Sequence, residues 1–130
     1  TGFGVWPAGH AAALFATRSP VTTMVLLLAV YLFSHYMFAS ITAHVTAMMP
    51  ITLAIAAGKP EIPVLQFALL LSFTHGLMGV LTPYATTSGP VYLASGFITT
   101  AESWRLGAIF GLIFFVALVG LAAPVVLCTR

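Results

Sequence analysis

Long apolar stretches alternate with short polar ones along the 130-residue chain. All six formal charges lie at or near the edges of the apolar stretches, which is the pattern expected in a bilayer, because a charge at the bilayer centre is costly. These residues are Arg18, Lys59, Glu61, Glu102, Arg105 and Arg130. They divide the chain into four parts, each of which predicts a different element.

The N-terminal part, residues 1–20, mixes glycine and proline with a short apolar run and ends at Arg18-Ser-Pro. It is too short and too broken for a membrane span, because glycine and proline interrupt helices. We therefore expect an interfacial segment. The chain opens at Thr1 without a targeting sequence, so we expect it to be part of a longer protein.

The second part, residues 21–58, carries no charge. As one helix it would extend roughly 57 Å at about 1.5 Å per residue, far beyond the ~30 Å hydrocarbon core, so it must break. Polar residues gather near its middle, at Ser40, Thr42, His44 and Thr46. The pattern predicts a helix over 21–39, a turn near 40–42 and a second helix to about Ala57. Hydropathy alone fits two arrangements equally: a re-entrant hairpin, or two spans joined by a polar loop.

The third part, residues 64–98, follows a rigid connection at 59–63 and predicts a broken transmembrane helix. An apolar helix over 64–83, a break at 85–90 and a short helix over 91–98 fit its pattern of apolar, hydroxyl, glycine and proline residues.

The last part, residues 104–127, predicts a C-terminal transmembrane helix that opens with the interface anchor Trp104-Arg105. Gly107 and Gly111 form a small-xxx-small pair that permits close helix contact, although coincidence explains it as well in a chain with so many glycines.

Together the four parts predict an all-α integral membrane protein, and the composition agrees. The chain is 61% hydrophobic and 5% charged, whereas a soluble domain carries about a quarter of charged residues. Its net charge is only +2, and it has no run of Lys or Arg that follows phosphates. A nucleic-acid partner is therefore not expected, and the lipid bilayer is.

Enzymatic machinery is not visible in the sequence. Its only carboxylates, Glu61 and Glu102, lie in connections, and its only cysteine is Cys128. We find no nucleophile–base pair, no phosphate-binding loop and no metal-ligand cluster. We therefore predict that the chain is not an enzyme and holds no metal.

Two clusters of hydroxyl residues are candidates for binding an anion. Hydroxyls and free backbone N–H groups at a helix break bind a carboxylate without a full charge, and paired breaks are typical of transporter sites. The clusters surround Ser40 and Thr42, and Thr86, Thr87 and Ser88. The alternatives are hydroxyls that bond a preceding carbonyl of their own helix and, for the second cluster, an ordinary extramembrane loop.

Histidines offer a second kind of chemistry. His44 is the best candidate for a titratable positive charge near an anion. A bis-histidine haem site formed by two of His35, His44 and His75 is an alternative, as are plain hydrogen bonds between helices. A haem-binding or purely structural membrane-anchor subunit is thus the competing function.

Two runs resemble the divalent anion:sodium symporter superfamily. Phe38-Ala-Ser-Ile-Thr-Ala-His-Val-Thr-Ala-Met-Met-Pro50 is similar to its second hairpin, and Leu81-Thr-Pro-Tyr-Ala-Thr-Thr-Ser-Gly-Pro90, continuing to Gly96, to the broken helix that follows. Trp104-Arg105-Leu106-Gly107 also fits. The branch that the chain resembles is that of the bacterial citrate/succinate and tartrate/succinate antiporters, with the plastid 2-oxoglutarate/malate translocators nearby.

The resemblance favours the re-entrant hairpin and implies which residues bind substrate. The Ser-Asn-Thr hairpin tip of the family matches Ser40, Ile41 and Thr42, and the broken-helix contact falls on Thr86 and Thr87. Isoleucine replaces the amide at Ile41. This implies exchange of citrate, succinate, tartrate or 2-oxoglutarate more than sodium symport, with His44 as a possible substitute for the cation.

The resemblance also implies partners. Family members consist of inverted repeats and work as homodimers, and this chain matches only part of the second repeat. We therefore expect an N-terminal half outside this chain, a bacterial inner-membrane location, and no transport by the chain alone.

Overall fold

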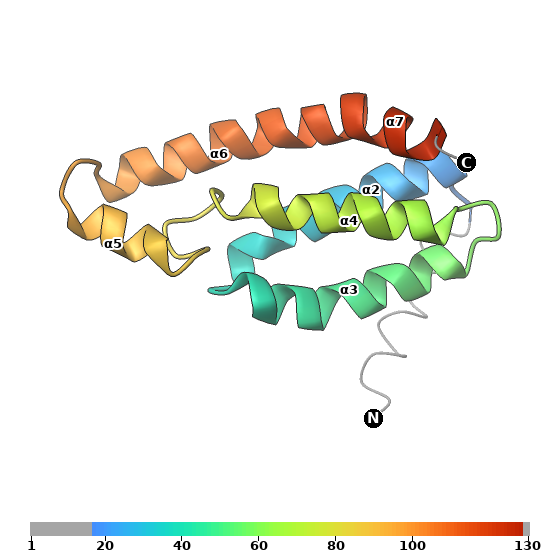
Figure 1. Ribbon diagram of the computed structural model, residues 1–130, viewed down its shortest axis with the longest axis horizontal. Coiled ribbons are helices and arrows are strands. Elements are labelled where there is room, and N and C mark those ends of the chain that lie inside the picture. Colours follow the sequence, from blue (N-terminus) through green and yellow to red (C-terminus); the bar gives the residue numbers. More distant parts are fainter. Residues whose placement is uncertain (1–16, 129–130) are drawn as a thin grey trace.

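The computed structural model describes residues 17–128 and contains only helices and their connections in that range (Figure 1). The predicted all-α class is therefore confirmed, while the re-entrant and repeat character stays a prediction. The predicted interfacial segment lies almost wholly outside the described residues. The helices are α2 (Pro20–Ser34), the 3-10 helix η1 (His35–Met37), α3 (Ile41–Ala57), α4 (Val64–Met78), α5 (Ser88–Ala94), α6 (Thr100–Ala117), the π-helix η2 (Leu118–Ala122) and α7 (Ala123–Cys128).

Helices α2 and α3 form an antiparallel pair, as the pattern predicts (Figure 1). The turn between them ends earlier than expected, because Ser40 is extended at φ −155° and its Oγ accepts from the Ala43 N–H at 3.4 Å. Such an N-cap starts a helix at the next residue. Ile41 and Thr42 therefore lie in the first turn of α3 rather than in the turn itself.

At the opposite end of the pair, α3 ends next to the beginning of α2. The Lys59 ammonium donates to the Arg18 carbonyl oxygen, which joins the two ends. From there Ile62 and Pro63 lead into α4, which runs back between α3 and the C-terminal helices (Figure 1).

Helix α4 ends at Met78, earlier than the predicted end at Pro83. Gly79 caps the helix. Further along, Pro83 disfavours helical geometry at the residue before it, so Thr82 does not resume the helix. Residues 79–87, here called the α4–α5 loop, form the break. The short helix after it also starts and ends earlier than predicted, at Ser88 and Ala94.

The last helical segment is continuous from Thr100 to Cys128 and is long and apolar enough to cross a membrane. It starts four residues before the predicted Trp104 because Thr99 and Glu102 form a capping box, in which each side chain accepts from the backbone of the other. Within it, the Ala123 N–H donates to the Leu118 carbonyl, five residues back. This π-turn immediately precedes Pro124, which has no N–H of its own to donate.

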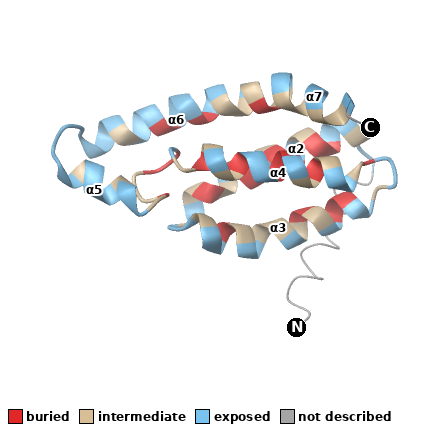
Figure 2. Ribbon diagram, viewed as in Figure 1, coloured by how far each residue is buried: buried red, intermediate tan, exposed pale blue. Residues whose placement is uncertain are grey.

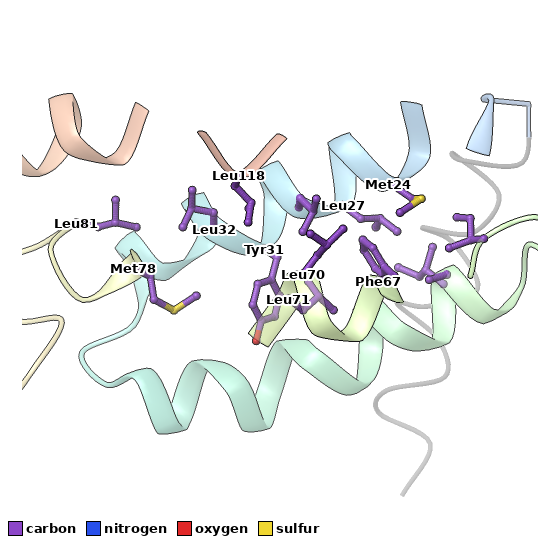
Figure 3. Packing of buried hydrophobic residues seen from close by; sticks show 14 residues of the cluster. Met24, Leu27, Tyr31, Leu32, Phe67, Leu70, Leu71, Met78, Leu81 and Leu118 are labelled. Carbon is purple, nitrogen blue, oxygen red and sulfur yellow. The ribbon is translucent and has the colours of Figure 1, made fainter. Parts of the chain in front are cut away.

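Helix α4 is the centre of the packing. It contacts α2, α3, α6 and α7, and the side chains between these helices form one apolar core (Figure 3). Tyr31, Leu32, Phe67, Leu70 and Leu71 are completely buried in it.

The long C-terminal helix is covered on one side only (Figure 2). Within α6 the buried residues are Gly107 and Gly111, whereas large apolar side chains such as Phe110, Leu112 and Val116 are exposed. An apolar exposed surface of this kind suits lipid or further membrane helices.

The two buried glycines of α6 receive the α4–α5 loop. A Cβ added to Gly107 would lie 2.3 Å from the Leu81 carbonyl oxygen, and one added to Gly111 would lie 2.4 Å from a Leu81 side-chain carbon. The small-xxx-small pair is thus a contact surface, but its partner is a loop rather than another helix.

We expect Gly107→Ala to lower the free energy of unfolding by about 1–3 kcal/mol, because the added methyl group overlaps main-chain atoms that have no rotamer to change. Gly76→Ala is the matched control, since a Cβ there meets nothing within 4 Å. Thermal unfolding of the purified protein in detergent measures both. Equal melting temperatures for the two variants would contradict the close approach.

Candidate functional site

The two polar breaks predicted from the sequence meet at one cavity. Its volume is about 230 Å³. The turn before α3 and the end of the α4–α5 loop form its wall, with the lining residues Ala39, Ser40, Ile41, Thr42, Ala85, Thr86 and Thr87. All five residues predicted to bind substrate therefore line the same space, although more than forty positions separate the two groups in the sequence.

One wall is the N-terminal end of α3. The first N–H groups of a helix have no partner within it and carry the positive end of the helix dipole. Ser40 and Thr42 are exposed beside these groups, and Ile41 is half-buried. This end of α3 therefore offers hydrogen-bond donors and partial positive charge to an anion in the cavity.

The other wall is the α4–α5 loop, which folds into successive tight turns. The Ala85 N–H donates to the Thr82 carbonyl at 3.2 Å, and the Gly89 N–H donates to the Thr86 carbonyl at 3.2 Å. The Thr86 hydroxyl lies 3.1 Å from the Ser88 hydroxyl, and Thr87 makes no side-chain cap to α5. The loop thus satisfies part of its own backbone while it presents hydroxyls to the cavity.

Three aromatic residues hold the loop in place. The Tyr84 hydroxyl donates to the Tyr36 carbonyl at 3.0 Å. The Trp104 ring stacks on Tyr36 at 5.9 Å between ring centres and contacts Tyr84 edge-on at 5.7 Å. They join η1, the loop and α6. The sequence alone does not reveal this role, because no spacing links residues from three separate elements.

The polar residues that follow the α3 N-terminus do not all face the cavity. His44 is completely buried, and its Nε2 lies 3.0 Å from the Ser34 hydroxyl of α2. It is not among the cavity-lining residues. The Thr46 hydroxyl donates to the Thr42 carbonyl of the same helix at 2.8 Å. This agrees with the alternative interpretation, in which a hydroxyl bonds a preceding carbonyl of its own helix. Of this first cluster only Ser40 and Thr42 lie at the cavity.

The histidine geometry gives no support to a haem site. The His35 and His44 rings are in edge contact at 5.2 Å between centres, and Tyr31 contacts the rings of both His44 and His75. Neither arrangement leaves a slot for a planar macrocycle between two ligands. Within residues 17–128, no group of three or more His, Cys, Asp or Glu side chains is arranged to hold a metal ion.

Among the residues that the structure describes, none with a charged side chain lines the cavity. An anion there would meet only hydroxyls, backbone N–H groups and a helix terminus. Such weak neutral donors suit a ligand that must be released again, because a fixed charge would hold it too tightly.

Comparison with known proteins gives the chain a family context. The family of the sodium:sulfate symporter transmembrane region matches residues 1–127. The chain is 40% identical to the citrate/succinate antiporter of Escherichia coli (strain K12) over 125 residues. This alignment covers 96% of the chain and 26% of that relative. The chain is 47% identical over 119 residues to the L-tartrate/succinate antiporter of the same strain, covering 92% of the chain and 24% of the relative. No solved structure matches the chain significantly.

The chain thus spans about a quarter of the length of these relatives. They are named as antiporters and not as enzymes, in agreement with the sequence-based prediction.

We expect Tyr84→Phe to loosen the α4–α5 loop, because it removes the hydrogen bond to the Tyr36 carbonyl while it keeps the ring. A lost bond of this kind costs about 0.5–1.5 kcal/mol. Tyr92→Phe is the matched control, since Tyr92 is exposed on α5. Melting temperatures and the rate of protease cleavage in the loop report the effect, and indistinguishable variants would argue against this support.

Proposed function

The chain belongs to the family of the sodium:sulfate symporter transmembrane region, and on this premise we propose that it is the C-terminal part of an antiporter for small di- and tricarboxylates. The printed functions of its relatives support citrate, succinate and tartrate as the substrate class. We place the antiporter in a bacterial inner membrane.

The observation that carries this proposal is the convergence of two helix breaks on one cavity. Ser40, Ile41 and Thr42 reach it from α3, and Thr86 and Thr87 from the α4–α5 loop. Non-helical backbone at membrane depth is tolerated only where protein or a water-filled cavity surrounds it. Broken helices that point their ends into such a cavity are the usual way in which transporters bind anionic groups.

The lengths of α3 and α4 support the second arm of the proposed re-entrant hairpin and the proposed broken helix, whereas the segment Pro20–Met37 is long and apolar enough to cross a membrane. Helices α3 and α4 contain 17 and 15 residues. At about 1.5 Å per residue they extend roughly 26 and 23 Å, which is less than the ~30 Å hydrocarbon core. The proposed arrangement places the ends of both helices, and with them the cavity, within the membrane.

The proposed antiporter contains more than this chain. The cavity is open and is lined on two sides by the described residues, so we assign the rest of the site to an N-terminal half with an inverted fold. The exposed apolar face of α6 is available to that half, to lipid or to a second subunit of a homodimer. The chain alone is then not expected to transport.

We expect Thr42→Ala and Thr86→Ala each to weaken succinate exchange by the full-length transporter in proteoliposomes. A hydrogen bond to a charged group contributes about 1.5–3 kcal/mol, so the loss of affinity should be on the order of tenfold to a hundredfold. Exchange of labelled external succinate against internal citrate gives the measurement.

Thr46→Ala is the matched control for this pair. Thr46 lies one turn beyond Thr42 on the same helix and bonds the backbone of its own helix. It should leave exchange unchanged. Unaltered exchange in both Thr42→Ala and Thr86→Ala would remove the cavity from the substrate pathway.

We expect exchange to be independent of sodium. The amide that would contribute to a sodium site in the family's hairpin tip is replaced by Ile41, which has no side-chain oxygen. Replacing sodium with potassium on both sides of the proteoliposome membrane should therefore leave the rate unchanged. A rate that falls in potassium and recovers with added sodium would show symport instead.

A further inference from the structure

A cluster of histidine and tyrosine side chains lies directly behind the proposed cavity. It contains His35 from η1, His44 from α3, Tyr31 from α2 and His75 from α4. His35, His44 and Tyr31 are completely buried. Buried titratable groups in membrane proteins are costly to keep and often form proton pathways.

Three ring nitrogens of this cluster are buried without a hydrogen-bond partner among residues 17–128: Nδ1 and Nε2 of His35 and Nδ1 of His44. A buried polar atom without a partner costs about 1–3 kcal/mol. Tyr31 and His75 are different, since the Tyr31 hydroxyl lies 2.7 Å from the His75 Nε2. The unsatisfied atoms therefore belong to one pair, His35 and His44.

The hydrogen bonds around Ser34 determine which nitrogen of His44 carries its proton. The Ser34 hydroxyl donates to the Tyr31 carbonyl at 3.0 Å. Its single hydrogen is then used, so it accepts from the His44 Nε2 at 3.0 Å. In neutral His44 the other nitrogen, Nδ1, is consequently a bare acceptor in a buried site.

The two rings lie at the separation that a shared proton requires. Their centres are 5.2 Å apart and their planes make an angle of 73°. Two imidazoles joined by a hydrogen bond of about 2.9 Å have centres roughly 5 Å apart, since each nitrogen lies about 1.2 Å from its ring centre. The bond is not formed in the structure, since both ring nitrogens of His35 lack a partner among the described residues, so a shared proton requires the His35 ring to turn.

Backbone hydrogen bonds also connect the His35–His44 pair to the turn that lines the cavity. The His44 N–H donates to the Ser40 carbonyl, and the Phe38 N–H donates to the His35 carbonyl. These two bonds enclose the turn that carries Ser40 into the cavity wall. The Phe38 ring also contacts the His44 ring at 4.9 Å.

We propose that His35 and His44 form a proton-binding site that takes up one proton when a carboxylate dianion enters the neighbouring cavity. The proton comes from cavity water, binds between His44 Nδ1 and a ring nitrogen of His35, and returns to water when the substrate leaves. This inference rests on the proposed function, since it needs an anion in the cavity.

The coupling follows from the cost of a buried charge. A lone positive charge in this apolar surrounding is unfavourable, but a dianion about one helical turn away offsets it. By reciprocity the bound proton strengthens anion binding to the same extent. The titratable groups that face the pair are Tyr31 and His75, which bind each other, and the charged residues within 17–128 lie at helix ends or in connections.

Calorimetry of succinate binding to the full-length transporter tests the site. Titrations in buffers of different ionisation enthalpy at about pH 7.5, well above the pKa of ordinary carboxyl groups, count the protons taken up by the protein. We expect about one proton per succinate and an affinity that rises about tenfold per pH unit lowered.

His35→Gln and His44→Gln should bind succinate without proton uptake and lose the pH dependence. The glutamine at position 44 can still donate to Ser34, and size-exclusion profiles check that each variant is folded. His75→Gln is the matched control, since His75 belongs to the cluster but bonds Tyr31, and it should keep the full proton uptake.

The outcomes separate this inference from the function on which it rests. Succinate binding without proton uptake by the unaltered protein, or full uptake in a folded His35→Gln or His44→Gln variant, overturns the proton site and leaves the antiporter intact. Failure of the unaltered protein to bind succinate or citrate overturns both.

Discussion

The peptide groups of the α4–α5 loop have to be protected inside an apolar molecule, and the positions of the other elements depend on this constraint. In a membrane an unsatisfied backbone N–H or C=O costs several kcal/mol. The loop meets the constraint by forming its own tight turns and by lying against α6, where Gly107 leaves space for the Leu81 carbonyl. The Tyr36, Tyr84 and Trp104 cluster then fixes the loop relative to the turn before α3.

This arrangement explains how a chain with so few charges forms the cavity that we propose as a site for an anion. The apolar core around α4 brings the end of the α2–α3 turn and the end of the loop to the same place. There, Ser40 and Thr42 face Thr86 and Thr87 across the cavity. Hydroxyls and a helix N-terminus attract a carboxylate without the large desolvation penalty of a buried full charge. The long C-terminal helix packs against the α4–α5 loop and supports it. The outer apolar face of this helix is exposed and is left for other partners.

Family membership and geometry contribute different parts of the functional argument. The match over residues 1–127 and the identity to two antiporters give the family of the chain, and they support the substrate class that we propose. They do not say which residues meet. The geometry shows which residues meet. It also separates neighbours in the sequence: Ser40 and Thr42 line the cavity, whereas His44 packs against α2 next to His35.

The sequence by itself determined the helical membrane class and the order of the main helices. Through the family resemblance it also pointed to five of the seven residues that line the cavity. Charge scarcity and local polarity are properties of the chain that folding does not change, so they are readable at once. Helix ends were shifted, because Ser40, Gly79 and the Thr99–Glu102 box act through local hydrogen bonds and caps that hydropathy does not weigh. Only the tertiary structure decided that Gly107 receives a loop, that Tyr84 bonds Tyr36 and that His44 turns away from the cavity, since each depends on contacts between residues far apart in the chain.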